Sequence, residues 1–190
     1  WRWPDLSLLK DYHSFLNNGD KISEKIQKFW ENLDKLIKDK EIKNIAILTH
    51  NLADLDGFAS AIALKDLLDN ILKDKKIQVK IFIPSLSNPI KSVISTLDIQ
   101  EVNNISKELD MKPDLVFLVD CNNINNIDPE YVSQLQGINI VVIDHHEANN
   151  DFSDDYVLHY VDSYSSSNAE LMVDFYSFLK IPISKHVGQI

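Results

Sequence analysis

The chain has 190 residues, enough for one domain with a hydrophobic core and a small appendage. Its net charge of −10 argues against a basic surface that binds nucleic acid through the phosphates, and its four glycines form no glycine-rich phosphate loop. No apolar run approaches the roughly 20 residues that cross a bilayer, and the single cysteine suits a reducing compartment. We therefore expect a cytoplasmic protein with no membrane partner.

The first segment, residues 1–40, is predicted to be a helical N-terminal appendage. Over residues 20–39, apolar side chains recur at helical spacing with charged residues between them, which indicates an amphipathic helix. We expect this helix to pack on the domain that follows. The appendage is also a candidate docking element for a protein partner.

The remainder, residues 41–190, has the pattern of an α/β domain. Short apolar runs rich in β-branched residues predict five strands, at 44–50, 78–84, 114–120, 139–144 and 156–161. Helical patterns lie between or after them, at 56–73, 88–97, 128–136 and 167–179. This alternation predicts a mainly parallel sheet with helices on both faces.

Acidic and imidazole side chains gather where three of the expected strands end. The seven residues are His50, Asp54, Asp56, Asp120, Asp144, His145 and His146. The carboxyl ends of parallel strands share one edge of the sheet, where ligands of such sheets bind. Four carboxylates crowded there without lysine or arginine are costly to bury unless a cation neutralises them. We therefore expect two divalent cations, which can clamp the oxygens of a phosphoryl displacement.

Structural alternatives remain open for some of these residues. Asp54 or Asp56 could cap the helix that follows. Ser167, with Glu170 three residues later, fits a capping box at the start of the last helix. Ser166 and Ser167 could also bind a phosphate there, through hydroxyls and backbone N–H groups.

Three motifs stand out in this part of the sequence: the spacing His50-x3-Asp54-x-Asp56-Gly57, Asp120 at the end of one strand, and Asp144-His145-His146 at the end of another. With these motifs the chain resembles the DHH phosphoesterase superfamily over roughly residues 42–180. That superfamily includes RecJ-type exonucleases, oligoribonucleases and cyclic dinucleotide phosphodiesterases. The resemblance implies a role for each residue. It assigns His50 and Asp54 to one manganese ion, Asp56 and His145 to the other, Asp120 to a bridge between them, His146 to the scissile phosphate, and Asp144 to orienting the histidine pair.

From this resemblance we expect a manganese-dependent phosphoesterase that hydrolyses a short oligonucleotide, a nucleoside bisphosphate or a cyclic dinucleotide by a two-metal mechanism. The substrate would be a small nucleotide or a short single-stranded nucleic acid. Two alternatives are a non-catalytic or weakly active scaffold subunit of a replication assembly and an inorganic pyrophosphatase-like enzyme.

The resemblance also implies a further metal-binding aspartate and a C-terminal substrate domain, neither of which this sequence contains. We expect either the N-terminal part of a longer protein or a short form that holds its second metal weakly.

Overall fold

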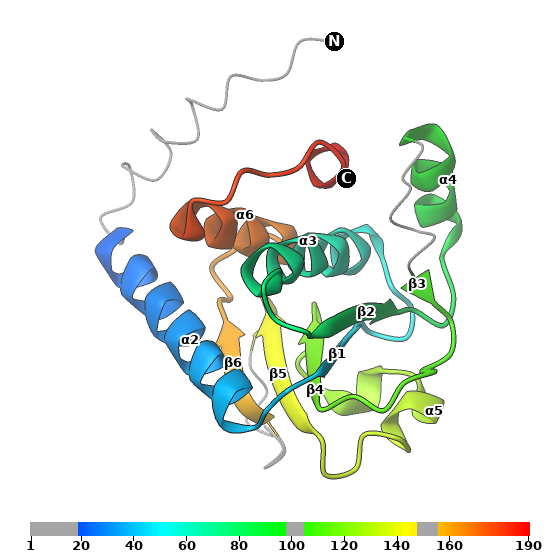
Figure 1. Cartoon of the computed structure of the whole chain (residues 1–190). Coiled ribbons are helices and arrows are strands. Elements are labelled where there is room, and N and C mark those ends of the chain that lie inside the picture. Colours follow the sequence, from blue (N-terminus) through cyan, green and yellow to red (C-terminus); the bar gives the residue numbers. More distant parts are fainter. Residues whose placement is uncertain (1–18, 98–104, 148–155) are drawn as a thin grey trace.

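The computed structural model describes residues 19–97, 105–147 and 156–190 (Figure 1). Most of the residues upstream of 20 in the predicted appendage lie outside these ranges. The helices are α2 (Gly19–Asp39), α3 (Leu55–Leu72), α4 (Asn88–Leu97), α5 (Pro129–Val132) and α6 (Asn168–Leu179), with 3₁₀ turns at Ile124–Asn126 and Val187–Gln189. The strands are β1 (Asn44–Leu48), β2 (Gln78–Phe82), β3 (Ile105–Ser106), β4 (Leu115–Val119), β5 (Asn139–Asp144) and β6 (Tyr156–Val161).

The six strands form one parallel sheet in the order β3-β2-β1-β4-β5-β6. The chain moves outward from β1 in one direction and outward from β4 in the other. The strand order therefore reverses between these two strands, and in sheets of this kind the reversal opens a crevice at the carboxyl ends. The expected parallel sheet is confirmed. The short β3 was not predicted, because two residues are too few to produce a periodic pattern.

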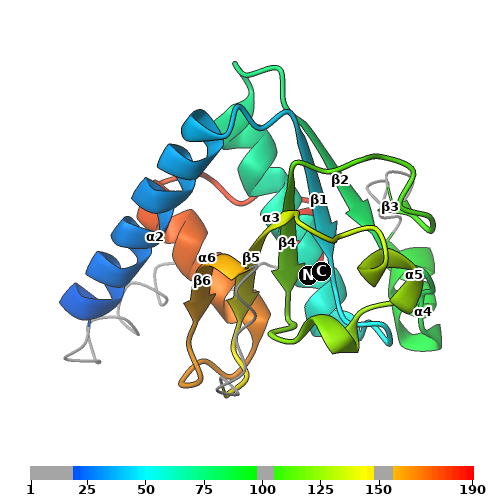
Figure 2. The ribbon, with the colours of Figure 1, turned by 90° about the horizontal axis from the view of Figure 1, so that it is seen from below.

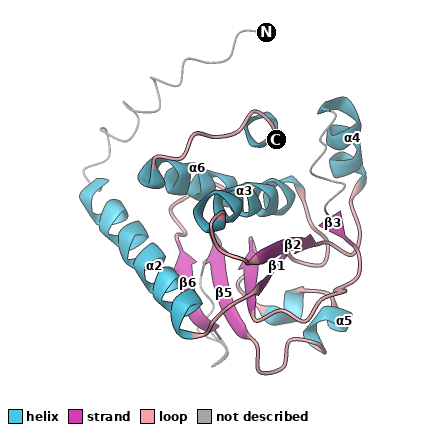
Figure 3. Ribbon diagram, in the orientation of Figure 1, coloured by secondary structure: helices cyan, strands magenta, loops and turns pink. Residues whose placement is uncertain are grey.

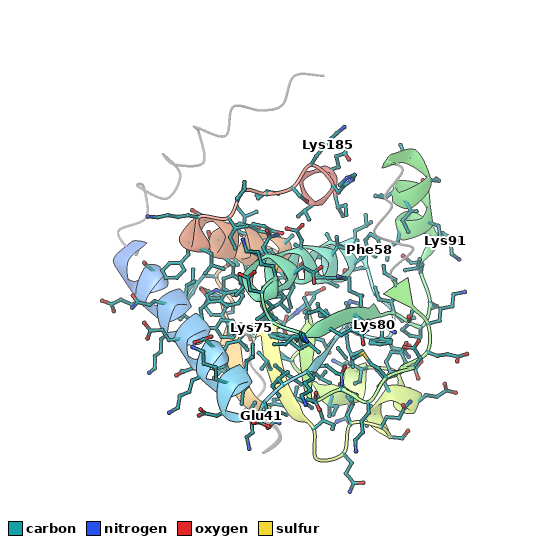
Figure 4. The ribbon with its side chains drawn as sticks, viewed as in Figure 1. Glu41, Phe58, Lys75, Lys80, Lys91 and Lys185 are labelled. Carbon is teal, nitrogen blue, oxygen red and sulfur yellow. The ribbon has the colours of Figure 1, made fainter. Side chains whose placement is uncertain are left out.

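Helices cover the sheet on both faces (Figure 3). On one face, α2, α3 and α6 share a core with the strands, and Phe58 of α3 is completely buried in it (Figure 4). On the other face, Tyr131 of α5 and the nearby Leu135 pack on Val116 and Val142 within a smaller cluster. Helices on both faces were predicted, and this arrangement confirms them.

The helix expected at 128–136 is shorter than predicted. Asp128 caps it and Pro129 occupies its first turn, but α5 ends at Val132. Beyond that point the backbone bonds shift to the tighter i to i−3 pattern, from Gln134 to Tyr131 and from Leu135 to Val132. The apolar spacing of a short α-helix and of such turns is similar, which explains the error.

Helix α2 confirms the amphipathic helix predicted for residues 20–39, and it packs beside β6 and α6 (Figures 1 and 2). Phe29 is 3% exposed and stacks on Phe175 of α6, with ring centroids 5.6 Å apart. It also meets Tyr160 of β6 edge-on. The apolar face of α2 thus belongs to the domain core, and the boundary at residue 40 stays a prediction. No helix in the described ranges is both long and apolar enough to cross a lipid bilayer.

We predict that Phe29→Ala lowers the free energy of unfolding by about 3 kcal/mol, because it leaves a cavity among three aromatic rings. Urea unfolding measures this loss. Lys28→Ala, an exposed substitution on the same helix, is the control and is expected to change the value by less than about 0.5 kcal/mol. Equal stability of the two variants would contradict the assignment of α2 to the core.

Candidate metal centre

Three strand ends bring the predicted polar residues together at the carboxyl edge of the sheet. His50 lies two residues beyond β1, Asp120 directly follows β4, and Asp144 is the last residue of β5. These strands are neighbours, so the residues gather at the point where the strand order reverses. Asp54 and Asp56 reach the same place from the start of α3.

Asp120 is the centre of the group. It is 3% exposed, and its backbone N–H donates to the carbonyl of Ile143 on β5. Its φ of 57° is in the left-handed region, which costs a non-glycine residue roughly 1 kcal/mol or more. One carboxylate oxygen, Oδ1, lies 3.5 Å from His145 Nε2, and the other, Oδ2, lies 3.7 Å from His50 Nε2. The two oxygens therefore face imidazoles from two different strands.

Gly57, on the first turn of α3, leaves the room that Asp120 needs. A Cβ at this position would lie 3.2 Å from Asp120 Oδ2. An alanine at this position would force the Asp120 carboxylate to shift by a few tenths of an ångström, so the missing side chain favours the close approach of α3.

The ring of His145 is oriented as metal-ligating histidines usually are. Its Nδ1 lies 3.3 Å from the carbonyl oxygen of Ser165, which can only accept a hydrogen bond. Nδ1 must therefore carry the proton, and Nε2 of the neutral ring is then an acceptor. Nε2 also lies 3.5 Å from carboxylate oxygens of both Asp56 and Asp120, which in their ionised forms only accept. A cation among these three groups would turn this repulsion into attraction.

Asp144 is completely buried and holds the histidine pair. Its Oδ1 accepts from the backbone N–H groups of His145 and His146, at 2.8 and 3.3 Å, and lies 2.8 Å from His146 Nδ1. Burial alone would lower the pKa of His146, but the hydrogen bond to Asp144 and the neighbouring carboxylates outweigh it and raise the pKa above its ordinary value. His146 therefore tends to keep its proton while its ring stays partly exposed.

Asp54 caps the helix that follows it, as one structural alternative held, whereas Asp56 bonds to the start of a different helix, α6. Asp54 accepts from Gly57 N–H at 3.0 Å and caps α3, while its Oδ1 lies 3.9 Å from His50 Nε2. Asp56 accepts from the first two N–H groups of α6, those of Asn168 and Ala169, at 2.7 and 2.8 Å. Capping a helix and binding a cation are compatible, since a carboxylate has about four acceptor sites.

Hydrogen bonds within the chain already use the serine side chains at the start of α6. Ser167 Oγ accepts from Glu170 N–H, which confirms the helix cap. The N–H and Oγ of Ser166 both donate to Glu170 Oε2. A phosphate could bind Ser166 and Ser167 only by replacing these bonds, and that role stays a prediction.

The side chains fit divalent cations. Asp120, His145 and His146 offer ligand atoms within 4.8 Å of one another, and so do His50, Asp54 and Asp120. Asp120 belongs to both sets, and its buried Oδ1 accepts no hydrogen bond from the described residues. A mixture of imidazole and carboxylate ligands suits manganese, iron or zinc better than calcium.

A cavity of about 570 Å³ opens beside these ligands, with a wall that the sequence did not reveal. The wall is made by Asn51, Leu52, Asn122, Asn126 and Glu147. The backbone N–H of Asn51 donates to the carbonyl of Asn126 at 2.7 Å and so ties the loops after β1 and β4 together. The asparagine-rich run after Asp120 was the one signal of this wall in the sequence, and by itself it reads as a loop.

We predict that the metal-free protein loses stability as the pH rises from 4 to 8. Burial raises the pKa of Asp120 to about 8, and the charges of Asp56, Asp54 and Asp144 add to the effect. The folded state therefore binds this proton more tightly than the unfolded state, so ionisation favours unfolding. Urea unfolding in EDTA is expected to show a loss of up to about 3 kcal/mol between pH 5 and pH 8.

Asp120→Asn is the comparison for this measurement, because it removes the carboxylate and keeps a residue that tolerates left-handed φ. Its stability is expected to vary much less over the same pH range. A pH dependence equal to that of the wild type would place the titrating group elsewhere.

We also predict that Gly57→Ala weakens manganese binding by about tenfold, because the new Cβ displaces the Asp120 carboxylate. Calorimetric titration with manganese measures this. Gly137→Ala is the matched control: its φ of 73° costs stability, but nothing lies within 4 Å of its Cβ, so the affinity for manganese is expected to stay the same. Equal affinities of the two variants would show that the close approach to Asp120 is unimportant.

Comparisons with known proteins gave a similar solved structure and a family. The structure resembles the crystal structure of an exopolyphosphatase-related protein from Bacteroides fragilis, with a TM-score of 0.59 and 20% sequence identity. The match covers 78% of this chain but 43% of that protein, so the chain spans less than half of its length. No curated protein matches the sequence. The family model for the N-terminal domain of the DHH family matches residues 44–189, and the chain therefore belongs to the DHH family.

Proposed function

We propose that this chain is the metal-binding domain of a phosphoesterase that hydrolyses a short oligonucleotide, a nucleoside bisphosphate or a cyclic dinucleotide. The observation that carries the proposal is the placement of Asp120. It is a buried, strained carboxylate whose two oxygens face imidazoles on opposite sides. The end of a strand with a purely structural role does not require a buried carboxylate in a strained backbone conformation.

The proposed ligand assignment is the one that the family resemblance implies, and the distances among these residues are compatible with it. His50 and Asp54 would hold one ion, Asp56 and His145 the other, and Asp120 would contact both. Asp120 lies within 4 Å of a ligand atom from each set, at 3.7 Å from His50 Nε2 and 3.5 Å from His145 Nε2. We propose manganese as the metal, because it accepts both carboxylate and imidazole ligands.

Bound divalent cations supply Lewis-acid stabilisation of the phosphoryl group and lower the pKa of water. The protein's own contribution is to position a proton beside them. Asp144 accepts from His146 Nδ1, and the protonated form of the ring, which Asp144 favours, can donate from Nε2–H to a phosphate oxygen. Because Asp144 also accepts two backbone N–H groups, the imidazole is held in one orientation before the substrate arrives.

We predict that Asp120→Asn abolishes manganese binding at one or both sites and lowers the hydrolysis of bis-p-nitrophenyl phosphate at least 100-fold, because the shared ligand loses its charge. Calorimetry with manganese measures binding, and p-nitrophenol release measures turnover. Asp69→Asn, an exposed residue paired with Lys65 on α3, is the control and is expected to behave as the wild type.

Each result separates the proposal from its rivals. Binding and turnover by the wild type, with both lost in Asp120→Asn, would support the phosphoesterase. Manganese binding without turnover of any phosphoester would favour the weakly active scaffold. A wild type that neither binds manganese nor hydrolyses the ester would overturn the proposal.

A further inference from the structure

The cavity beside the metal centre has two chemically different walls. One part of the lining includes the candidate ligands His50, Asp54 and Asp120, together with Asp144 and His146. The other part, here called the second wall, consists of three amide side chains, Leu52 and Glu147. A cavity of about 570 Å³ is larger than a single phosphate requires and falls within the range of small-molecule sites. The second wall therefore has room to contact the group that the phosphate carries.

The charges of the cavity oppose a second phosphate. Its lining includes four carboxylates and two imidazoles, and no lysine or arginine of the described residues. The lysines labelled in Figure 4, Lys75, Lys80, Lys91 and Lys185, lie on segments outside the lining. Bound cations would offset the carboxylates nearest to them, but Glu147 is not among the proposed ligands and would repel a further anion. The group next to the reacting phosphate should therefore be uncharged.

The amides of this wall are suited to an uncharged polar ring. Asn51 and Asn126 are exposed, and among the described residues their side chains form no hydrogen bond. Asn122 donates through Nδ2 to the carbonyl of Glu147 at 3.0 Å, which leaves its Oδ1 as an acceptor. An asparagine amide both donates and accepts, and so matches the paired donor and acceptor of a nucleobase edge. The Glu147 carboxylate could accept from an exocyclic amine.

Leu52 supplies the apolar part of the same wall. Its side chain is 81% exposed, an unusual amount for a leucine at the mouth of a polar cavity. Such a side chain can cover the flat face of a base, which would bury apolar surface on both partners.

We propose that Asn51, Leu52, Asn122, Asn126 and Glu147 form a nucleobase subsite, which makes the substrate a nucleoside phosphoester instead of an inorganic polyphosphate. This inference rests on the proposed phosphoesterase function and adds the part of the substrate that the second wall recognises. The phosphate meets the metal centre, and the base lies against the loops that follow β1 and β4.

The test compares two ligands that carry the same phosphate and differ by the base. AMP and ribose 5-phosphate are titrated into the full chain in the presence of manganese, and their dissociation constants are measured by calorimetry. AMP is expected to bind about tenfold more tightly. Leu52→Ala and Asn126→Ala are each expected to weaken AMP binding by about threefold to tenfold, the effect of one lost contact, and to leave the affinity for ribose 5-phosphate within twofold.

Two controls match these variants. Asn32→Ala removes an exposed amide from α2, and Ile71→Ala removes a half-exposed apolar side chain near the end of α3, both outside the cavity. Neither should change the affinity for AMP.

The outcomes distinguish the subsite from the function itself. Equal affinities for AMP and ribose 5-phosphate, or an equal loss of both affinities in the variants, would overturn the nucleobase subsite. Hydrolysis of bis-p-nitrophenyl phosphate by the same protein would still support the phosphoesterase function. If neither ligand binds and no ester is hydrolysed, both proposals fall together.

Discussion

The architecture of the carboxyl edge depends on the burial of one carboxylate, that of Asp120. Removing this charge from water is expensive, and three neighbouring aspartates make it more so. The surrounding structure nevertheless holds it in place, through a left-handed turn, a backbone bond to β5 and the close approach of Gly57 in the first turn of α3. These features all place the Asp120 carboxyl group between the imidazoles of His50 and His145, which follow β1 and β5, at the crevice where the strand order reverses.

Much of the fold could be predicted because its signals are local. Buried parallel strands are continuous apolar runs, and β5 begins and ends where that pattern predicted. The long helices α2, α3 and α6 are periodic over three turns or more. The errors lie where the local signal is short or ambiguous. A strand of two residues has no period, and the turns after α5 imitate a longer helix.

The candidate site was predictable as a set of residues but not as a geometry. The order of strands is enough to bring His50, Asp120 and His145 to one edge. It does not reveal that Ser165 offers a carbonyl to His145, because a backbone acceptor carries no side-chain signature. The amide wall of the cavity was missed for a related reason, since asparagines in a loop are ordinary turn residues until the fold places them beside a site.

The bonds from Asp56 to the first N–H groups of α6 have a consequence for how the protein is made. They join residues 112 and 113 positions apart, so a growing chain on the ribosome carries an incomplete centre until α6 has emerged. Before then, Asp56 lacks the dipole of the helix that attracts its charge, and His145 lacks the carbonyl of Ser165. Binding of metal by the complete set of proposed ligands would therefore have to follow the emergence of α6 and its packing against Asp56.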